Sequence, residues 1–421
     1  MRKRDFMSKV VQMSSAMVAF NISDICYSIY MSKVLGAESI GVFHLIMNVF
    51  AMGVSLSVSG MTLTTTRLLS DSGASEASAN SILKKCIRLC LVTSGFSAAI
   101  LFCFSDFIAS KIIKVPECAL SLRMLTPVLL CIGVSAPLNG YFTAFGKVGA
   151  ISVGKCLSHG VMWVSGLYFF GRIPPTQGFL AAVLVRLFAE GSETVCDVIM
   201  WKISSGLGSG KSDVSYRKII KLCMPIALGS FLRTGLSSGE NLLIPILTDS
   251  GGLASYGILK GMAMPVMMFP YVFMGAFNSL MVPEIARRRA LNYKNSIRYI
   301  TKLTIRDTLK FSLIVFVFFF LWHGKICSLF FRFEKAGTYL LYLSFFPVLM
   351  FLDSSVDAIL KGLDQQVFSL KINTADSVMR IILILILVPK YGIVGYIGVM
   401  YISEIINLGA SYWKLKAVTA Q

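Results

Sequence analysis

Charged residues are scarce in this chain of 421 residues. Asp, Glu, Lys and Arg together make up 14% of it, hydrophobic residues make up 55%, and the mean hydropathy is +0.73. A soluble protein of this size carries about 25% charged residues. No soluble domain interrupts the succession of apolar runs. The composition excludes a soluble globular protein and predicts an all-α polytopic membrane protein, in which the bilayer replaces a water-excluded core.

Metal ligands and paired cysteines are also scarce. The 10 cysteines are scattered without a CxxC motif, and the 3 histidines (His44, His159 and His323) do not have ligand spacing. Cys86 and Cys90 share one helix face, but no histidine is near them, so they are interpreted as packing residues. The acids in the expected loops are isolated, and neither clustered carboxylates nor an activated nucleophile is recognisable. The sequence therefore predicts no metal, no cofactor and no enzymatic activity.

Acidic residues are outnumbered by basic ones, 21 to 40, which gives a net charge of +19. This excess does not indicate nucleic-acid binding, because the lysines and arginines lie in short loops between apolar runs. They favour one side of the expected membrane by roughly three to one, the side that holds both termini. The basic N-terminus is interpreted as preceding a retained first span, because Gln12, Asn21 and Asp24 interrupt the apolar run and no convincing cleavage site follows. We expect a protein of the cytoplasmic membrane with both termini in the cytoplasm.

Hydropathy predicts about twelve membrane-spanning helices. Their expected ranges are 10–32, 40–66, 82–110, 119–144, 150–171, 176–201, 216–247, 252–283, 299–331, 336–361, 366–388 and 392–413.

One tract occurs twice, about half a chain apart. Lys33–Asp71 and Thr248–Arg289 each contain a glycine-bearing turn, a long apolar helix and a charged end. The repetition predicts an N-terminal six-helix lobe (1–203), a glycine- and serine-rich linker (204–215) and a C-terminal six-helix lobe (216–421). Because an even number of spans gives both halves the same orientation, the repeats are parallel. Secondary transporters with this construction bind substrate between the two bundles.

Four ionisable side chains lie away from the ends of the expected spans one, seven and eight: Asp24, Arg233, Glu240 and Lys260. Charges at bilayer depth are costly and usually pair or face a polar cavity. One interpretation is an anion site with Arg233 and Lys260 as donors and Asp24 or Glu240 as a coupling or cavity acid. The alternative is that Glu240 and Lys260 only pair with each other. The stretch from Arg233 to Glu240 lies between prolines and predicts a weakened or broken helix.

Other charges favour structural roles. Arg186 and Glu190, like Asp376 and Arg380, are spaced to pair on one helix, and a third acidic and basic set follows one helix face (Asp353, Asp357 and Lys361). Arg67 and Glu284 end equivalent spans of the two repeats. They suggest a cytoplasmic gate, or alternatively two charges that only end their helices at the headgroups.

The repeated tract, the segment SGMTLTTTRLLSD and the segment ILKGLDQQVFSLKINTADSVMRIILILILVPKYGIVGYIG resemble the stage V sporulation protein B branch of the oligosaccharide flippases. The larger superfamily also holds multidrug and toxin extruders and lipid II flippases. The resemblance covers nearly the whole chain. It implies two lobes forming a V, a central cavity lined by spans one, two, seven and eight, and alternating access.

Two transport functions remain open from the sequence. The first is a flippase for a polyprenyl-diphosphate-linked sugar, a precursor of the cell wall or of a polysaccharide. The second is a cation-coupled exporter of organic cations. Arg233 and Lys260 favour the diphosphate, whereas Asp24 and Glu240 favour the exporter. In either case the expected partners are the substrate and the bilayer, transport is driven by a proton, by sodium or by the membrane potential, and the protein acts as a monomer.

Overall fold

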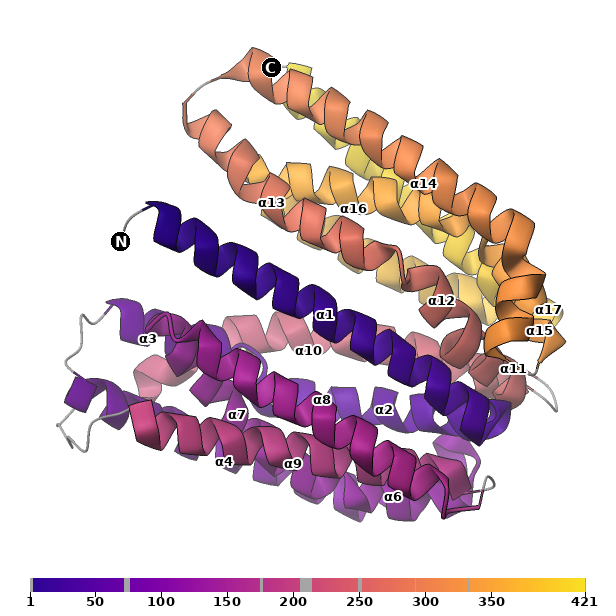
Figure 1. Cartoon of the computed structure of the whole chain (residues 1–421), viewed down its shortest axis with the longest axis horizontal. Helices are drawn as coiled ribbons and strands as arrows, with labels where there is room; N and C mark the ends of the chain where they lie inside the picture. The colour runs from indigo at the N-terminus through magenta and orange to yellow at the C-terminus, as the bar shows by residue number, and fades with distance from the viewer. Residues whose placement is uncertain are drawn as a thin grey trace. The chain divides into compact units, whose positions relative to one another are not determined.

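The computed structural model is all-helical in the part that it describes, residues 3–71, 76–174, 177–204, 214–248, 252–291, 293–331 and 333–420 (Figure 1). No strand occurs in these ranges, as expected for a chain that must satisfy its backbone hydrogen bonds within a bilayer. The helices form two compact units. Unit 1 comprises Met1–Phe20 and Val34–Leu242, and unit 2 comprises Asn21–Lys33 and Leu243–Gln421.

The helices that lie wholly or mostly in unit 1 are α1 (Lys3–Leu35), α2 (Ala37–Val58), α3 (Met61–Asp71), α4 (Glu76–Cys103), α5 (Ser105–Phe107), α6 (Ala119–Met124), α7 (Thr126–Ala144), α8 (Val148–Phe170), α9 (Gly178–Ser204) and α10 (Tyr216–Leu247). A π-helix (Ile108–Ile113) and a short 3-10 helix (Pro116–Cys118) connect α5 to α6. Residues 21–33 of α1 belong to unit 2. The predicted linker 204–215 lies mostly outside the described residues, so the predicted lobe boundary stays a prediction.

Unit 2 contains α11 (Gly252–Ile258), the π-helix η4 (Leu259–Ala263), α12 (Met264–Met268), α13 (Tyr271–Ala290), α14 (Lys294–Phe330), α15 (Glu334–Leu343), α16 (Phe346–Gly362) and α17 (Gln366–Ala420). Each of the expected spans coincides with helix. By length and composition, 6 helices of the described residues can cross a membrane, or 8 if each bent pair is one span. The helices α1, α8 and α9 do not meet this test because of their polar residues, and α17 holds both of the last two expected spans.

Three expected spans are bent or broken. The first repeat tract divides into α2 and α3 at Ser59 and Gly60, and Gly60 has a φ of 77°. Its counterpart bends by 55° between α12 and α13, and α15 and α16 meet at 48°. In α17, Gly392 has non-helical angles. Ser403 then returns to contact Asp376, so the chain reverses at Gly392 and the last two spans are antiparallel.

The ends of α7 and α16 share one capping geometry. At the end of α7, the Lys147 amide donates to the Phe142 carbonyl, and Gly146 has a φ of 64°. At the end of α16, the Gln365 amide donates to the Leu360 carbonyl, and Asp364 has a φ of 61°. A left-handed residue with this hydrogen bond is a common helix cap, which glycine favours and aspartate tolerates.

The core of unit 1 packs through small residues. Gly140 of α7 lies so close to α3 that an added Cβ would be 2.6 Å from the Thr62 carbonyl oxygen and 2.8 Å from the Thr65 Cβ. The Thr66 hydroxyl donates to the Gly140 carbonyl across the same contact (3.0 Å). Close backbone approach at small residues is the usual way in which membrane helices associate, because lipid provides little hydrophobic driving force between them. The polar SGMTLTTTRLLSD tract is therefore a packing surface.

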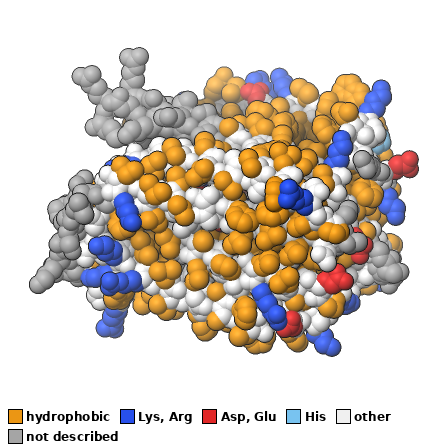
Figure 2. Space-filling model, turned by 60° about the horizontal axis from the view of Figure 1, so that its bottom comes forward, with side chains coloured by type: hydrophobic (Ala, Val, Ile, Leu, Met, Phe, Trp, Pro, Cys, Tyr) orange, Lys and Arg blue, Asp and Glu red, His pale blue; other side chains and the backbone are white. Residues whose placement is uncertain are grey.

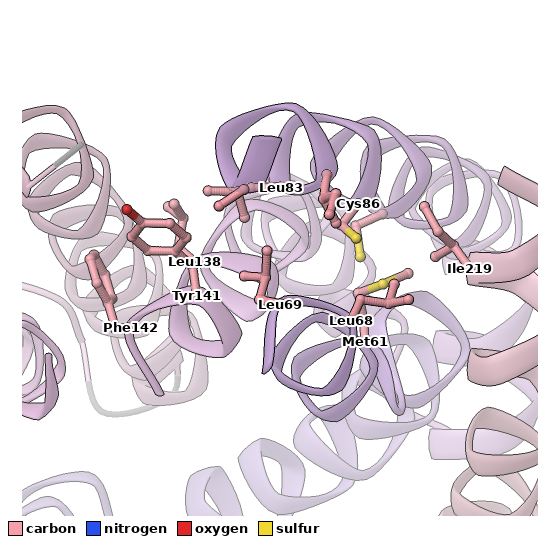
Figure 3. Packing of buried hydrophobic residues seen from close by; sticks show 12 residues of the cluster. Met61, Leu68, Leu69, Leu83, Cys86, Leu138, Tyr141, Phe142 and Ile219 are labelled. Carbon is pink, nitrogen blue, oxygen red and sulfur yellow. The ribbon is translucent and has the colours of Figure 1, made fainter. Parts of the chain in front are cut away.

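Around this contact lies a cluster of buried side chains from α3, α4, α7 and α10 (Figure 3). Leu68 and Leu69 of α3 pack with Leu138 and Tyr141 of α7. The cluster also contains Cys86 and Cys90, which are fully buried and free, together with Ile219, Met61, Ala79, Ile82, Leu83 and Phe142. The prediction that these cysteines are packing residues is confirmed. Unit 2 has a corresponding cluster around Ile285, Ile359 and Leu360.

The surface is apolar where lipid is expected. Hydrophobic side chains cover most of the face drawn in Figure 2, and Lys and Arg side chains lie mostly near its borders. The large side chains of Val92, Val164 and Ile314 are 70%, 70% and 68% exposed, respectively. Patches of this kind on a soluble protein would promote aggregation. On a membrane protein they are the surface that the acyl chains cover.

Candidate functional site

Two of the expected site residues, Arg233 and Glu240, lie on α10 in unit 1. The predicted break between them is wrong, because α10 is helical from Tyr216 to Leu247. The physical reason is that a freed backbone group costs several kcal/mol in lipid, so the helix persists through glycine, serine and proline. Arg233 and Glu240 are seven residues apart and therefore lie on nearly the same face, about 10 Å apart along the axis. Arg233 is exposed, whereas Glu240 is 4% exposed.

The surroundings of Glu240 are polar and come from α2. The Ser238 hydroxyl donates to the Asn48 carbonyl (3.1 Å), and the Asn241 amide donates to the Asn48 side-chain oxygen (3.1 Å). Farther along the same two helices, the Ser59 hydroxyl donates to Ser230 (3.2 Å). These bonds join α10 to α2 and its C-cap, and the first two lie next to Glu240 in the chain.

The third expected residue, Lys260, lies in unit 2 on the π-helix η4. Its ammonium donates a hydrogen bond to the Tyr396 hydroxyl (2.8 Å) and lies 5.0 Å from the centre of that ring. Tyr396 is fully buried, and Lys260 is half-buried. The Ser32 hydroxyl of α1 donates to the Gly261 carbonyl within the same π-turn. Short π-turns inside membrane or soluble helices occur frequently at functional sites.

The remaining expected residues are placed as follows. Asp24 is exposed on the part of α1 that belongs to unit 2. Arg67 is exposed at the end of α3 in unit 1. Glu284 accepts hydrogen bonds from Arg287 (3.2 Å) and Arg288 (2.7 Å) on its own helix, α13. These bonds neutralise Glu284 within α13, which continues beyond it to Ala290, so Glu284 does not end its helix as expected. The gate between Arg67 and Glu284 stays a prediction, as does the pairing of Glu240 with Lys260.

The structure shows a polar network in unit 2 that sequence reasoning predicted only in part. The Asn407 amide donates to the Asp353 carboxylate (3.0 Å) and lies 3.4 Å from the Asn373 side-chain oxygen. Ser403 donates to Asp376. The sequence signal that remained unused was Glu404, an acid in the apolar last span, half-buried in the structure and one turn from this network.

The network continues across unit 2 through neutral groups. The Asn278 amide of α13 donates to Ser354 of α16 (2.8 Å), and the Ser355 hydroxyl donates to the Asn278 side-chain oxygen (3.1 Å). Ser355 also lies 3.1 Å from the Thr308 hydroxyl of α14. The expected local pair of Asp357 with Lys361 is present at 2.5 Å. Four helices thus contribute to a continuous polar interior that contains ionisable groups.

Unit 1 has a second set of buried acids, on α9. Glu193 is 4% exposed and forms an ion pair with Lys155 of α8 (2.6 Å), and Asp197 is 1% exposed. Gly154 makes room for this carboxylate, because a Cβ there would lie 2.8 Å from Asp197 Oδ1. The expected pair of Arg186 with Glu190 is present at 2.5 Å. Sequence reasoning missed this set. Among the described residues, no group of three or more His, Cys, Asp or Glu side chains has the arrangement of a metal site.

Comparison with known proteins adds the fold family. Residues 225–386 match the MatE family model, and no curated protein matches the sequence. An inward-facing multidrug resistance MATE family transporter of the MOP superfamily superposes with a TM-score of 0.76 at 15% identity, covering 97% of this chain and 99% of that one. The chain has the MATE transporter fold.

Two further solved structures share the MATE fold of this chain. The lipid II flippase MurJ in an inward closed conformation has a TM-score of 0.73 at 17% identity, covering 96% of this chain and 87% of that one. A MOP superfamily transporter from Pyrococcus furiosus has a TM-score of 0.63 at 16% identity, covering 97% of this chain and 96% of that one. Its description states that the reversed polarity of its binding pocket suggests a different function. These likenesses establish the fold.

Proposed function

We propose that this MATE-fold chain moves a polyprenyl-diphosphate-linked sugar across the cytoplasmic membrane by alternating access. The observation that carries the proposal is a cation on each unit at expected bilayer depth, Arg233 exposed on α10 and Lys260 on a π-turn. Cations are costly in a bilayer and are retained where they bind something. Charge-assisted hydrogen bonds from arginine and lysine are well suited to phosphate oxygens.

The surroundings of Lys260 support this assignment. An ammonium has three donor hydrogens, and the Tyr396 hydroxyl accepts one of them. Tyr396 is neutral, so this contact orients the ammonium without adding a negative charge. The contact of Lys260 with the ring face holds the charge in place at low desolvation cost. A lysine presented in this way is a suitable ligand for one phosphate of a diphosphate.

A second candidate function is the cation-coupled export of organic cations. It is favoured by the half-buried acids of unit 2, where Asp353, Asp376 and Glu404 lie on three successive spans, Asp353 accepting from Asn407 and Asp376 from Ser403. Asp24 and Glu240 add acids on spans one and seven. Acids of this kind also serve as coupling sites for protons or sodium in a flippase. The substrate assay below therefore decides between the two functions.

The proposal is tested in reconstituted vesicles that contain either a fluorescent polyprenyl-diphosphate sugar or a cationic dye. We expect Lys260→Gln to lower translocation of the lipid-linked sugar by about 30-fold, as for the loss of a charge-assisted hydrogen bond worth about 2 kcal/mol. Tyr396→Phe, which keeps the ring, should lower it by a smaller factor. The matched control is Lys390→Gln, which removes an exposed lysine from the turn between the last two spans. Dye export that requires Asp24 and Glu240, with sugar translocation unaffected by Lys260→Gln, would replace the first function by the second.

The orientation has its own test. Single cysteines at positions 210 and 288 in a cysteine-free background should not react with membrane-impermeant reagents in intact cells, and should react after permeabilisation. The reason is the concentration of lysines and arginines on the side that holds both positions. Position 288 lies at the basic end of α13, and position 210 lies outside the described residues. Labelling of either position in intact cells would contradict cytoplasmic termini.

A further inference from the structure

A cavity of about 440 Å³ lies in unit 2 between the start of α14 and the end of α17. Figure 1 shows these two segments side by side next to the C-terminus, at the opposite end of the unit from α11 and α12, between which η4 lies in the chain. Its lining residues are Arg298, Thr301, Lys302, Ile305, Arg306, Leu309, Tyr412, Leu415, Lys416 and Thr419. No aspartate or glutamate is among the described residues that line it. The cavity is separate from the groups assigned to transport.

The charge of the cavity comes from four cations. Arg298, Lys302 and Arg306 follow one another at four-residue intervals and therefore share one face of α14. Like charges at this spacing destabilise a helix. Arg306 is partly compensated by its neighbour Asp307 (3.1 Å), and Arg298 Nε donates to the Thr419 carbonyl (2.6 Å), a contact with α17. The fourth cation, Lys416, lies on α17, so the two helices present their positive charges to the same space.

One lining group is a buried hydroxyl without a partner. Thr301 is 7% exposed, and its Oγ1 makes no hydrogen bond within the described part of the chain. A threonine in a helix usually bonds to a carbonyl one turn earlier, so the unpaired hydroxyl is unusual. An unsatisfied buried hydroxyl costs about as much as a lost hydrogen bond. An acceptor atom of a ligand in the cavity would remove this cost.

The lining of the cavity is cationic and apolar side by side. Arg298, Lys302 and Arg306 alternate along α14 with Ile305 and Leu309, and Lys416 follows Leu415 on α17. The neighbouring Tyr412 and Trp413 are 41% and 69% exposed. Tyr and Trp are enriched where a membrane helix passes through the headgroup layer. A lining of this kind beside aromatic residues suits the charged headgroup of a phospholipid and the first carbons of its acyl chains.

We infer that this cavity binds the phosphate headgroup of an anionic phospholipid, with the Thr301 hydroxyl donating to the lipid and its glycerol and upper acyl region on Ile305, Leu309 and Leu415. A free phosphate would use only the cations and would leave the apolar side chains uncovered. The expected place of the cavity at the cytoplasmic ends of its helices agrees with the preference of basic pockets on that side for anionic headgroups. A lipid bound there would join α14 to α17 and neutralise the row of like charges.

The test uses the purified full-length protein in a mild detergent. We measure its unfolding temperature and count its bound lipids by native mass spectrometry. Each measurement is made with phosphatidylglycerol and with phosphatidylcholine that has the same acyl chains. The wild type should retain phosphatidylglycerol and unfold at a higher temperature with it than with phosphatidylcholine. In the variant Arg298→Gln/Lys302→Gln/Lys416→Gln, the ratio of the affinity for phosphatidylglycerol to that for phosphatidylcholine should fall by about a hundredfold. The matched control, Lys202→Gln/Lys218→Gln/Lys221→Gln, removes three exposed lysines of unit 1 and should retain the wild-type ratio.

A second variant covers failure of the first to fold. Thr301→Val keeps the side-chain shape and removes the hydroxyl, so it should fold at least as well as the wild type in phosphatidylcholine. It should bind phosphatidylglycerol several-fold more weakly, by the loss of one hydrogen bond. Three results would overturn the inference. They are equal lipid preference in the control and cavity variants, unchanged binding in Thr301→Val, or full replacement of phosphatidylglycerol by inorganic phosphate at matched ionic strength, which would identify a free-phosphate site.

Discussion

Arg233→Ala is expected to lower translocation of a polyprenyl-diphosphate sugar by roughly 30- to 1,000-fold in reconstituted vesicles, which corresponds to about 2–4 kcal/mol. Arg233 is exposed on α10, so its guanidinium is available to a ligand without disruption of a core contact. Arginine binds phosphate oxygens in a bidentate manner, and such bonds are roughly twice as strong as neutral ones. In a site that excludes water, the loss of this group is not compensated by solvent.

Further substitutions of Arg233 distinguish the contribution of its charge to transport from that of its planar guanidinium. Arg233→Lys should keep part of the activity, because the charge remains while the planar fork is lost. Arg233→Glu should not support translocation, because it repels the diphosphate. The matched control is Arg217→Ala, which removes an exposed arginine from the first turn of the same helix and should leave transport unchanged. Unfolding temperatures of all variants in detergent establish that each is folded.

Wild-type rates of sugar translocation in both Arg233→Ala and Lys260→Ala would be incompatible with the proposed substrate. If Asp24→Ala or Glu240→Ala at the same time abolishes dye efflux, the exporter is the correct function. Neutralising Arg233 would then leave efflux intact or improve it, because a cavity for organic cations is better without a competing base.

The second large effect concerns folding and centres on Gly140. Gly140→Ala is expected to lower the unfolding temperature in detergent by roughly 5–10 °C, the shift that about 2–3 kcal/mol produces in a large chain. The added Cβ would lie 2.6 Å from the Thr62 carbonyl oxygen and 2.8 Å from the Thr65 Cβ. Both obstacles belong to the α3 packing surface, and one of them is backbone, so neither can move aside as a flexible side-chain end does. Gly140→Val should leave little folded protein.

The matched control is Gly95→Ala on α4. Both substitutions replace glycine by alanine inside a helix, which by helix propensity alone favours folding by about 1 kcal/mol. A Cβ at position 95 meets nothing within 4 Å, so Gly95→Ala should be neutral or stabilising. The difference between the two variants isolates the contact of α3 with α7. Equal unfolding temperatures for the two would mean that the helices are not in close contact there.

Local features were predictable because their physical causes lie within a few residues of each other. The low charge content and the apolar runs predicted an all-helical membrane chain. The spacing of four residues was sufficient for the pairs of Arg186 with Glu190 and of Asp357 with Lys361, since such residues are neighbours on any helix. The burial of Cys86 and Cys90 followed in the same way, from their position on one face and the lack of other metal ligands.

Sequence reasoning failed where a side chain meets a partner on another helix. The contacts of Lys260 with Tyr396, of Lys155 with Glu193 and of Asp353 with Asn407 join residues on different helices. Each contact depends on which faces of two helices meet and on where along the helix axes they meet. The spacing of residues along the chain specifies neither.

The sequence by itself determined the helical class and the scarcity of chemistry-bearing groups, because composition and periodicity respond to the bilayer as a solvent. The tertiary structure alone decided how the polar residues are used. It made the threonine-rich tract a packing surface for Gly140, kept α10 continuous where glycine and proline predicted a break, and assembled polar residues of four helices into one interior. The physical reason is that in lipid every polar group must find a protein partner, and only the packed helices decide which partner is within reach.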